Sequence, residues 1–126
     1  MLFWIILALV IAGVAYVQLA PSDATRWHAR IKRAENFDFK AGAVRVVDAE
    51  LTALDKIIRA SGTKVLAGSV EEGLVTYITR TRFIRFPDYT TVQQLDGKLA
   101  IYGRLRFGRS DLGVNKRRIE GWLAQL

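Results

Sequence analysis

The chain opens with an apolar run, MLFWIILALVIAGVAYVQLA, in which no position carries a charged side chain. As a helix at ~1.5 Å per residue, this run spans ~30 Å, the thickness of a bilayer core. We therefore predict a transmembrane helix over residues 1–20. Trp4 and Tyr16 lie near its two ends, where aromatic rings favour the headgroup zone, so we expect both at the membrane interface.

A cleaved signal peptide is the main alternative to a membrane anchor. Signal peptides normally begin with a basic region, and no lysine or arginine precedes this apolar run. Ala20 is also followed by Pro21, which makes a poor cleavage site. We expect the segment to be retained as a single-pass anchor.

Residues 21–43 are predicted to form a basic juxtamembrane linker. Within them, WHARIKR fits a short surface helix on the headgroups, although an ordinary solvated basic stretch explains it equally well. On the helical interpretation, Trp27 and Ile31 face inward. The cations then face anionic lipid headgroups: Arg30, Lys32 and Arg33. Because nothing basic precedes the span, the positive-inside rule places the C-terminal domain in the cytoplasm.

Residues 44–126 read as one α+β domain. Runs rich in β-branched and aromatic residues predict strands over 43–47, 63–69, 74–86, 90–95 and 98–107. Asp48 is expected to cap a helix over 49–60, and Ser110 or Asp111 a final helix. The apolar face of the final helix is spaced at helical intervals: Ile119, Trp122, Leu123 and Leu126. This order predicts a small antiparallel sheet with two helices packed on one face.

Turns at Pro87-Asp88 and Asp96-Gly97 would divide the strand residues between two faces of the sheet. The face expected under the helices is apolar: Val75, Tyr77, Phe83, Val92, Leu99, Ile101, Leu105 and Phe107. The other face is cationic: Arg80, Arg82, Tyr89, Gln93, Tyr102, Arg104 and Arg106. It is either an ordinary solvated face or a docking surface, since arginine and tyrosine are enriched at interaction sites. A slip of one residue near Phe86 would move Arg80 and Arg82 to the opposite face.

The net charge of +7 favours acidic partners, among them lipid headgroups, nucleic acid or an acidic protein face. The chain has no cysteine, which excludes disulfides, thiolate metal sites and cysteine nucleophiles. His28 is the single histidine, and we find no zinc pattern, nucleophile elbow or phosphate loop. Asp88 and Asp111 would form a carboxylate pair only if the fold joined them. We therefore predict no catalytic residue, metal, cofactor or nucleic-acid partner.

The segment RFGRSDLGVNKRR, residues 106–118, leads from the last strand into the last helix. Ser110 or Asp111 can accept hydrogen bonds from the first amides of the helix. Asn115 and Arg118 lie one turn apart and can lock the loop against the domain. A structural corner is one interpretation, and a pocket for a small anion near Arg109 and Asn115 is the other.

This segment resembles the C-terminal signature of the domain of unknown function 1499 family, DUF1499. The matching residues are Arg109, Ser110, Asp111, Gly113, Asn115, Lys116 and Arg118. TYITRTRFIRFPDYTTV is similar to the family's central strands, and APSDATRWH to anchored bacterial members. The resemblance implies no activity, because the family has none assigned. It does imply an exported domain in bacteria or plastids, in contrast to the basic flank after the span.

Our leading hypothesis is a non-catalytic accessory subunit in the bacterial inner membrane, anchored beside a larger respiratory, photosynthetic or transport complex. The cations expected to dock are Arg80, Arg82, Arg104 and Arg106, with Tyr102 among them. The alternative is a tethered domain that binds a small anionic ligand or a lipid headgroup. A hydrolase or isomerase using Asp88 or Asp111 ranks third.

Overall fold

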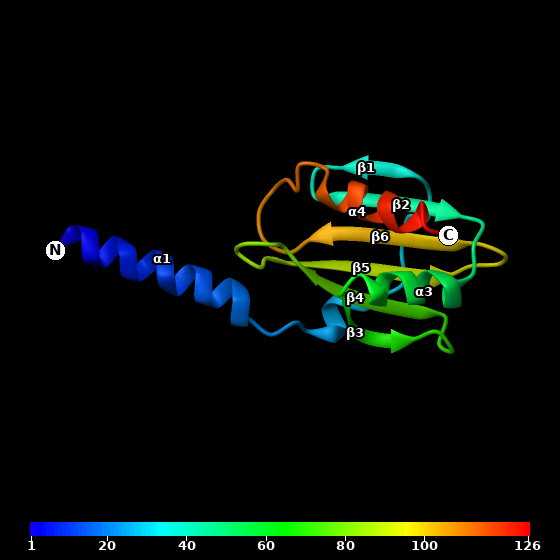
Figure 1. Cartoon of the computed structure of the whole chain (residues 1–126), viewed down its shortest axis with the longest axis horizontal. Coiled ribbons are helices and arrows are strands. Elements are labelled where there is room, and N and C mark those ends of the chain that lie inside the picture. The colour runs from blue at the N-terminus through cyan, green and yellow to red at the C-terminus, as the bar shows by residue number, and fades with distance from the viewer.

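The computed structural model describes residues 1–126, and its first element stands apart from the rest. Helix α1 (Leu2–Leu19) projects from one end of the folded domain, and none of its residues is buried (Figure 1). Its mean hydropathy of 2.4 over 18 residues makes it long and apolar enough to cross a membrane. A signal sequence meets the same requirement of length and composition.

The domain is built on a six-stranded sheet in the order β1-β2-β6-β5-β4-β3, and all neighbouring strands are antiparallel (Figure 1). Its strands are β1 (Phe37–Phe39), β2 (Gly42–Val47), β3 (Lys64–Ser69), β4 (Leu74–Arg80), β5 (Pro87–Gln94) and β6 (Leu99–Leu105). The predicted hairpin at Asp96-Gly97 joins β5 to β6, and Gly97 supplies the positive φ of 73° that the turn requires.

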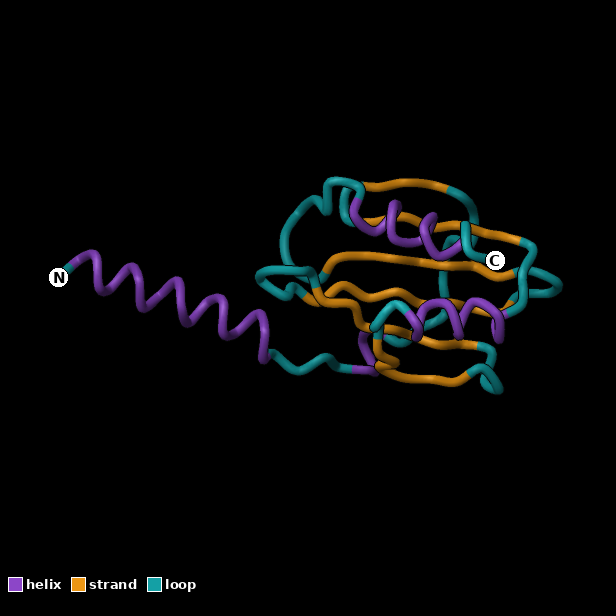
Figure 2. Tube along the Cα trace, viewed as in Figure 1, coloured by secondary structure: helices purple, strands orange, loops and turns teal.

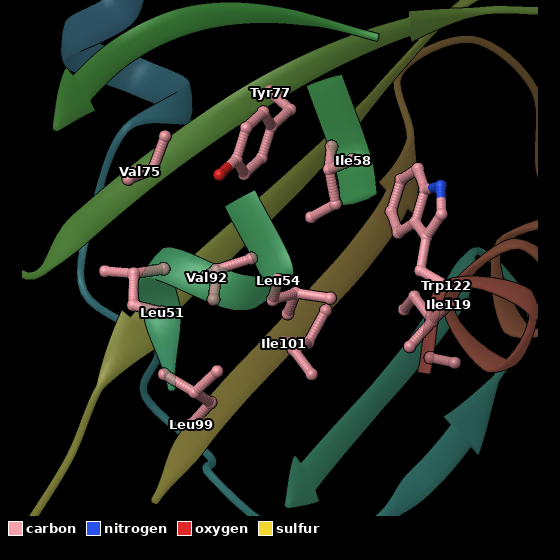
Figure 3. Packing of buried hydrophobic residues seen from close by; sticks show 11 residues of the cluster. Leu51, Leu54, Ile58, Val75, Tyr77, Val92, Leu99, Ile101, Ile119 and Trp122 are labelled. Carbon is pink, nitrogen blue, oxygen red and sulfur yellow. The ribbon is translucent and has the colours of Figure 1, made fainter. Parts of the chain in front are cut away.

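Helices α3 (Leu51–Ala60) and α4 (Val114–Leu123) lie on one face of this sheet. Each buries an apolar stripe with helical spacing, which covers the alternate strand residues that point toward it. Figure 3 shows the resulting core, which includes Leu51, Leu54, Ile58, Val75, Tyr77, Val92, Leu99, Ile101, Ile119 and Trp122. The predicted α+β fold with two helices on one face is confirmed.

One polar link ties α3 to the sheet inside this core. The Tyr77 hydroxyl donates to Asp55 Oδ1 at 2.5 Å, and Asp55 also accepts from Arg59 Nε at 3.0 Å. Burial, together with the bond to Asp55, raises the pKa of Tyr77. The phenol therefore remains a hydrogen-bond donor at any ordinary pH.

The predicted Asp48 cap was wrong, and two other stretches differ in detail from what was expected. Asp48 does not cap α3, which starts at Leu51 without a side-chain cap, and instead pairs with Lys98 at 3.3 Å. The predicted linker contains β1 and the start of β2. A short helix α2 spans Ala24–Trp27, so only the first residue of WHARIKR is helical.

The turn between β4 and β5 lies earlier in the chain than predicted. β4 stops at Arg80, which pairs with Pro87, so Pro87 and Asp88 begin β5 instead of forming the turn. Residues 81–86 make the reversal, with Arg85 at a positive φ of 63°. Phe83 consequently leaves the sheet and is 86% exposed, contrary to its predicted place in the core. No glycine or proline marks a turn there, which explains the error.

Gly42 is the position where the sheet leaves no room for a side chain. A Cβ atom there would lie 1.9 Å from the carbonyl oxygen of Gly103 on β6. Replacing Gly42 with alanine should therefore force β2 away from β6 and lower the free energy of unfolding by about 1–3 kcal/mol. Gly121→Ala is the matched control, because a Cβ in that helical position meets nothing within 4 Å. It should instead stabilise the fold by about 0.5–1 kcal/mol in chemical denaturation, and equal effects would contradict this account.

Candidate functional site

The sheet face opposite the two helices is covered by the chain's own juxtamembrane segment, residues 21–36. Trp27 stacks on Tyr89 with ring centroids 4.2 Å apart, and the Ile31 amide donates to Gln93 Oε1 at 2.7 Å. The start of the segment is fixed as well, because Arg106 donates to the Pro21 carbonyl at 2.9 Å. The predicted cationic face therefore exists as a set of residues but is not an open, solvated surface.

A directional chain of hydrogen bonds runs beneath this segment. Its links are Arg104 Nη1 to Thr91 Oγ1 at 2.8 Å, Thr91 to Thr76 at 2.9 Å, Thr76 to His28 Nδ1 at 2.8 Å, and His28 Nε2 to Glu72 at 3.1 Å. A guanidinium only donates and a carboxylate only accepts. Arg104 is therefore the donor at one end of the chain, and His28 Nε2–H donates to the Glu72 carboxylate at the other.

This arrangement of threonine, histidine and glutamate has a structural role. Thr76 is fully buried, so no substrate can reach its hydroxyl. Gly68 leaves the space that the imidazole occupies, because a Cβ there would lie 2.6 Å from His28 Cε1. His28 thus fastens the juxtamembrane segment to β4.

A cavity of about 650 Å³ remains between residues 26–33 of this segment and the outer strands. Its apolar wall is formed by Trp27, Ile31, Phe37, Phe39, Val44 and Tyr102. Five cations line the same space: Arg26, Arg30, Lys32, Arg33 and Arg104. No acidic residue belongs to the lining, and Glu35 lies outside it as the partner of Arg33. The cavity combines aromatic surface with positive charge.

Arg104 is the unusual member of this lining, because it is a buried charge without a counterion. Arg104 is only 7% exposed, and its three hydrogen-bond acceptors are all neutral: Thr91 Oγ1, Tyr102 O and Trp27 O. Burial lowers the pKa of Arg104 to about 10, so the group is still cationic at neutral pH. Its Nε–H and one terminal N–H have no acceptor within the chain.

The four arginines predicted to form the docking face lie in different environments. Arg104 is not a free surface cation, because Trp27 and Tyr102 enclose it, with its Cζ 4.4 Å from the Tyr102 ring. Arg106 is committed to Pro21 and Tyr89. Arg80 lies at the end of β4, and Arg82 lies in the following loop instead of on the sheet. Of the four arginines predicted for docking, Arg82 thus lies off the sheet, and Arg104 and Arg106 are bonded to the juxtamembrane segment.

The segment 106–118 forms a buried polar corner. Arg118 Nη1 donates to Asp88 Oδ2 at 3.1 Å and to Asn115 Oδ1 at 2.8 Å. The Asn115 side chain in turn donates to Asp111 at 2.9 Å and to Asp88 at 3.3 Å. Asp111 also accepts from the Asn115 backbone amide at 3.0 Å, so it bonds a free amide at the start of α4, as predicted. It does so from outside the N-cap position, which Gly113 occupies.

The centre of the corner is buried, whereas its start is exposed. Asp88 is 4% exposed and Asn115 is fully buried, whereas Arg109 and Ser110 point into solvent. Gly103 permits this packing, because a Cβ there would lie 3.1 Å from Asn115 Oδ1. Burial raises the pKa of Asp88, against the opposing effect of Arg118. The geometry supports the structural interpretation of this segment.

Two aromatic residues of the cavity, Phe37 and Phe39, were missed by sequence reasoning, because β1 was not recognised. Phe37 and Phe39 come from β1, where they alternate around Asp38 and therefore share one face. The FDF alternation followed by the Lys40-Ala41-Gly42 turn was the available signal. Of the predicted membrane-interface residues, Trp27, Arg30, Lys32 and Arg33 line the cavity, and Trp4 and Tyr16 lie on α1.

Neighbouring arginines provide a test of the corner. Arg118→Met leaves the Asp88 carboxylate buried without its cation, so the free energy of unfolding should fall by about 3–5 kcal/mol at neutral pH. Arg117→Met removes an exposed side chain that donates only to the Leu112 carbonyl. This control should change the free energy of unfolding by less than about 0.5 kcal/mol in the same denaturant measurement.

The loss of unfolding free energy in Arg118→Met should depend on pH, because burial raises the pKa of Asp88. Losing Arg118 raises that pKa further, so the variant's folded state binds the proton more tightly. The deficit of Arg118→Met should therefore narrow as pH falls toward 4, measured by denaturant unfolding at each pH. A deficit that is independent of pH would contradict a role for charge at Asp88.

Comparison with known families completes the description of the site. A family model described as "Protein of unknown function (DUF1499)" matches residues 18–126. Searches of curated proteins and of solved structures give no match. The matched range includes the juxtamembrane segment, the whole sheet and the polar corner, and so contains every residue of the cavity. The chain therefore belongs to the DUF1499 family.

Proposed function

We propose that this protein is a membrane-anchored binding module that holds an anionic amphiphile in the cavity beneath residues 26–33. The observation that carries the proposal is Arg104, a buried guanidinium without a carboxylate partner beside an open cavity. Burying an unpaired charge is costly, and an anion in the cavity would offset that cost. The module binds without catalysing a reaction and needs no cofactor.

The charges of the lining select the head of the ligand. Five cations and no acids line the space, so a phosphate or carboxylate is attracted there from a distance. The N–H groups of Arg104 that lack acceptors suit an oxygen-rich anion, because a guanidinium binds such groups through more than one donor.

The apolar wall selects the tail. Phe37, Phe39 and Val44 lie side by side on β1 and β2, since Val44 pairs with Phe37 in the sheet register. A volume of about 650 Å³ falls within the range of small-molecule sites, ~300–1,000 Å³. Together, the wall and the cations fit a ligand with an anionic head and a hydrocarbon or aromatic portion.

The position of the cavity suggests the bilayer as the source of the ligand. Phe39 and Arg104 lie toward the ends of β1 and β6 that point to α1 (Figure 1). If α1 is embedded in lipid, these strand ends face the membrane surface. An amphiphile that partitions into the bilayer would then be concentrated next to the site.

An accessory subunit that docks on a larger membrane complex is the second candidate function. It was expected to use the cationic sheet face, which the juxtamembrane segment now covers. What favours it still is the exposed Phe83 with Arg82 beside it, a pairing common at interaction sites. The geometry supports the binding module better, because the cavity has both a shape and an unsatisfied charge.

Octyl phosphate is a suitable probe of the cavity. The full chain in phosphatidylcholine nanodiscs should bind it saturably in isothermal titration calorimetry, after subtraction of empty nanodiscs. Octyltrimethylammonium should not bind, and inorganic phosphate should bind much more weakly. The double variant Arg30→Gln, Lys32→Gln should lose about tenfold in affinity, or about 1.4 kcal/mol.

The control for charge is Lys56→Gln, Lys64→Gln, which removes the same net charge from residues outside the cavity lining. Its affinity for octyl phosphate should match that of the wild type. If both double variants weaken binding equally, the effect is one of overall charge and the cavity is not the site. An absence of saturable heat in the wild type would overturn the proposal.

The proposal also requires that α1 remain attached. Ala20 is only 6% exposed, and the Pro21 carbonyl is held by Arg106, so the junction is packed against the domain and is a poor protease substrate. Protein extracted from its own membranes should therefore give the full-chain mass of 14.2 kDa in intact mass spectrometry. A shorter chain that starts after Ala20 would identify residues 1–20 as a signal sequence.

A further inference from the structure

We propose that the β4–β5 loop, residues 81–86, is a second membrane contact that places Phe83 and Ile84 among the lipids and Arg82 and Arg85 at anionic headgroups. The inference rests on the proposed location of α1 in the bilayer, but not on a ligand in the cavity. It assigns a lipid surface as the partner of this loop.

The loop lies at the depth of the membrane interface because it contacts the last turn of α1. Gln18 Nε2 donates to the Ile84 carbonyl at 3.1 Å. The segment after β6 also contacts α1, since the rings of Tyr16 and Phe107 meet edge to face with centroids 6.0 Å apart. Figures 1 and 2 show the β4–β5 loop at the end of the domain from which α1 departs.

The apolar side chains of the loop are not used by the fold. Phe83 is 86% exposed and Ile84 is 44% exposed, and neither belongs to the core. Leu112, on the connection from β6 to α4, is 82% exposed. Large exposed apolar residues gathered beside a membrane helix favour burial in lipid, where leaving water stabilises them.

The charges of the loop suit an anionic surface. Arg80, Arg82 and Arg85 form no salt bridge, and residues 79–86 contain no acid. Arg82 lies over the Phe83 ring with its Cζ 5.7 Å from the centroid. Arginines next to apolar residues are typical of segments that insert their apolar groups and leave the cations at the phosphates.

The loop is also held in one shape. The Thr81 amide donates to the Phe86 carbonyl at 2.9 Å, and the Phe86 amide donates to Thr81 Oγ1 at 2.8 Å. Arg80 Nη1 adds a bond to the Arg85 carbonyl at 3.1 Å, and Arg85 itself adopts a positive φ. A tip closed in this way presents Phe83 and Ile84 together without further ordering on contact with lipid.

A nitroxide probe tests the depth of the loop. Because the chain has no cysteine, Ile84→Cys carries the only thiol, and Phe83 stays in place. The labelled full chain is reconstituted in nanodiscs of phosphatidylcholine, with or without phosphatidylglycerol. Power saturation then compares the access of oxygen and of a water-soluble nickel complex. Labels at Leu9→Cys on α1 and Asp96→Cys on the distant β5–β6 turn define the lipid and water limits.

The label at residue 84 should resemble the one at residue 9 more than the one at residue 96, and should move deeper when phosphatidylglycerol is added. Phe83→Ser should make it shallower, and Arg82→Gln, Arg85→Gln should abolish the response to phosphatidylglycerol. A label as water-exposed as that at residue 96 in both lipids would overturn the proposal. If the label at residue 84 is protected from water only in native membranes, the loop contacts a protein instead of lipid, and the proposal is overturned.

The same preparations separate this inference from the cavity. Arg82→Gln, Arg85→Gln should bind octyl phosphate as the wild type does, since neither arginine lines the cavity. Loss of octyl phosphate binding with a normal depth at residue 84 would reject the proposed ligand and keep the membrane contact. A water-exposed label at residue 9 would reject the anchor, and with it the membrane contact.

Discussion

The buried charge of Arg104 is the constraint on which the arrangement of the domain depends. A guanidinium placed in the middle of a sheet must find acceptors, and β5 and β6 supply only the Thr91 hydroxyl and the Tyr102 carbonyl. The third acceptor is the Trp27 carbonyl at 2.6 Å, from a segment 77 positions away. The juxtamembrane segment is thus drawn onto the sheet by a hydrogen bond to a charged group, which is stronger than one between neutral groups. All three acceptors are neutral, so the positive charge of Arg104 has no counterion within the chain.

This fastening changes how the anchor relates to the domain. A linker of residues 21–43 between span and domain would have let the domain tumble at the end of a tether. Instead, Pro21 and Ser22 are already bonded to Arg106 and Tyr89, immediately after α1 ends. The contacts of Gln18 and Tyr16 with the loops add to this connection. The orientation of the sheet relative to α1 is therefore set by packing, and one end of the domain consistently faces whatever surrounds the helix.

Much of this fold is readable from local sequence. Helical spacing identified α3 and α4, Asp96-Gly97 identified a hairpin, and alternation placed Tyr89, Tyr102 and Arg104 on the face away from the helices. Failures occurred where the signal was not local. Residues 81–86 are rich in β-branched and aromatic types, so they read as strand, and the register of Arg80 against Pro87 is a property of the pairing alone. The cover over the sheet was not predictable, because it depends on Trp27 and Arg104 meeting across 77 positions. The cavity was missed for the same reason.

The cations after the span show why charge alone could not reveal the site. Arg30, Lys32 and Arg33 satisfy the positive-inside count, which depends on sequence position and is indifferent to the fold. The same three residues line the cavity. Their charge is therefore accounted for both by the positive-inside rule and by a role in the cavity. The aromatic residues distinguish the two explanations: a topological signal has no need of Trp27, Phe37 and Phe39, whereas a cavity for an amphiphile requires an apolar wall opposite its cations. Because Trp27 both forms this wall and accepts the bond from Arg104, the residue that fastens the segment to the sheet also builds the cavity. The contact that holds the segment on the sheet therefore also sets one wall of the cavity.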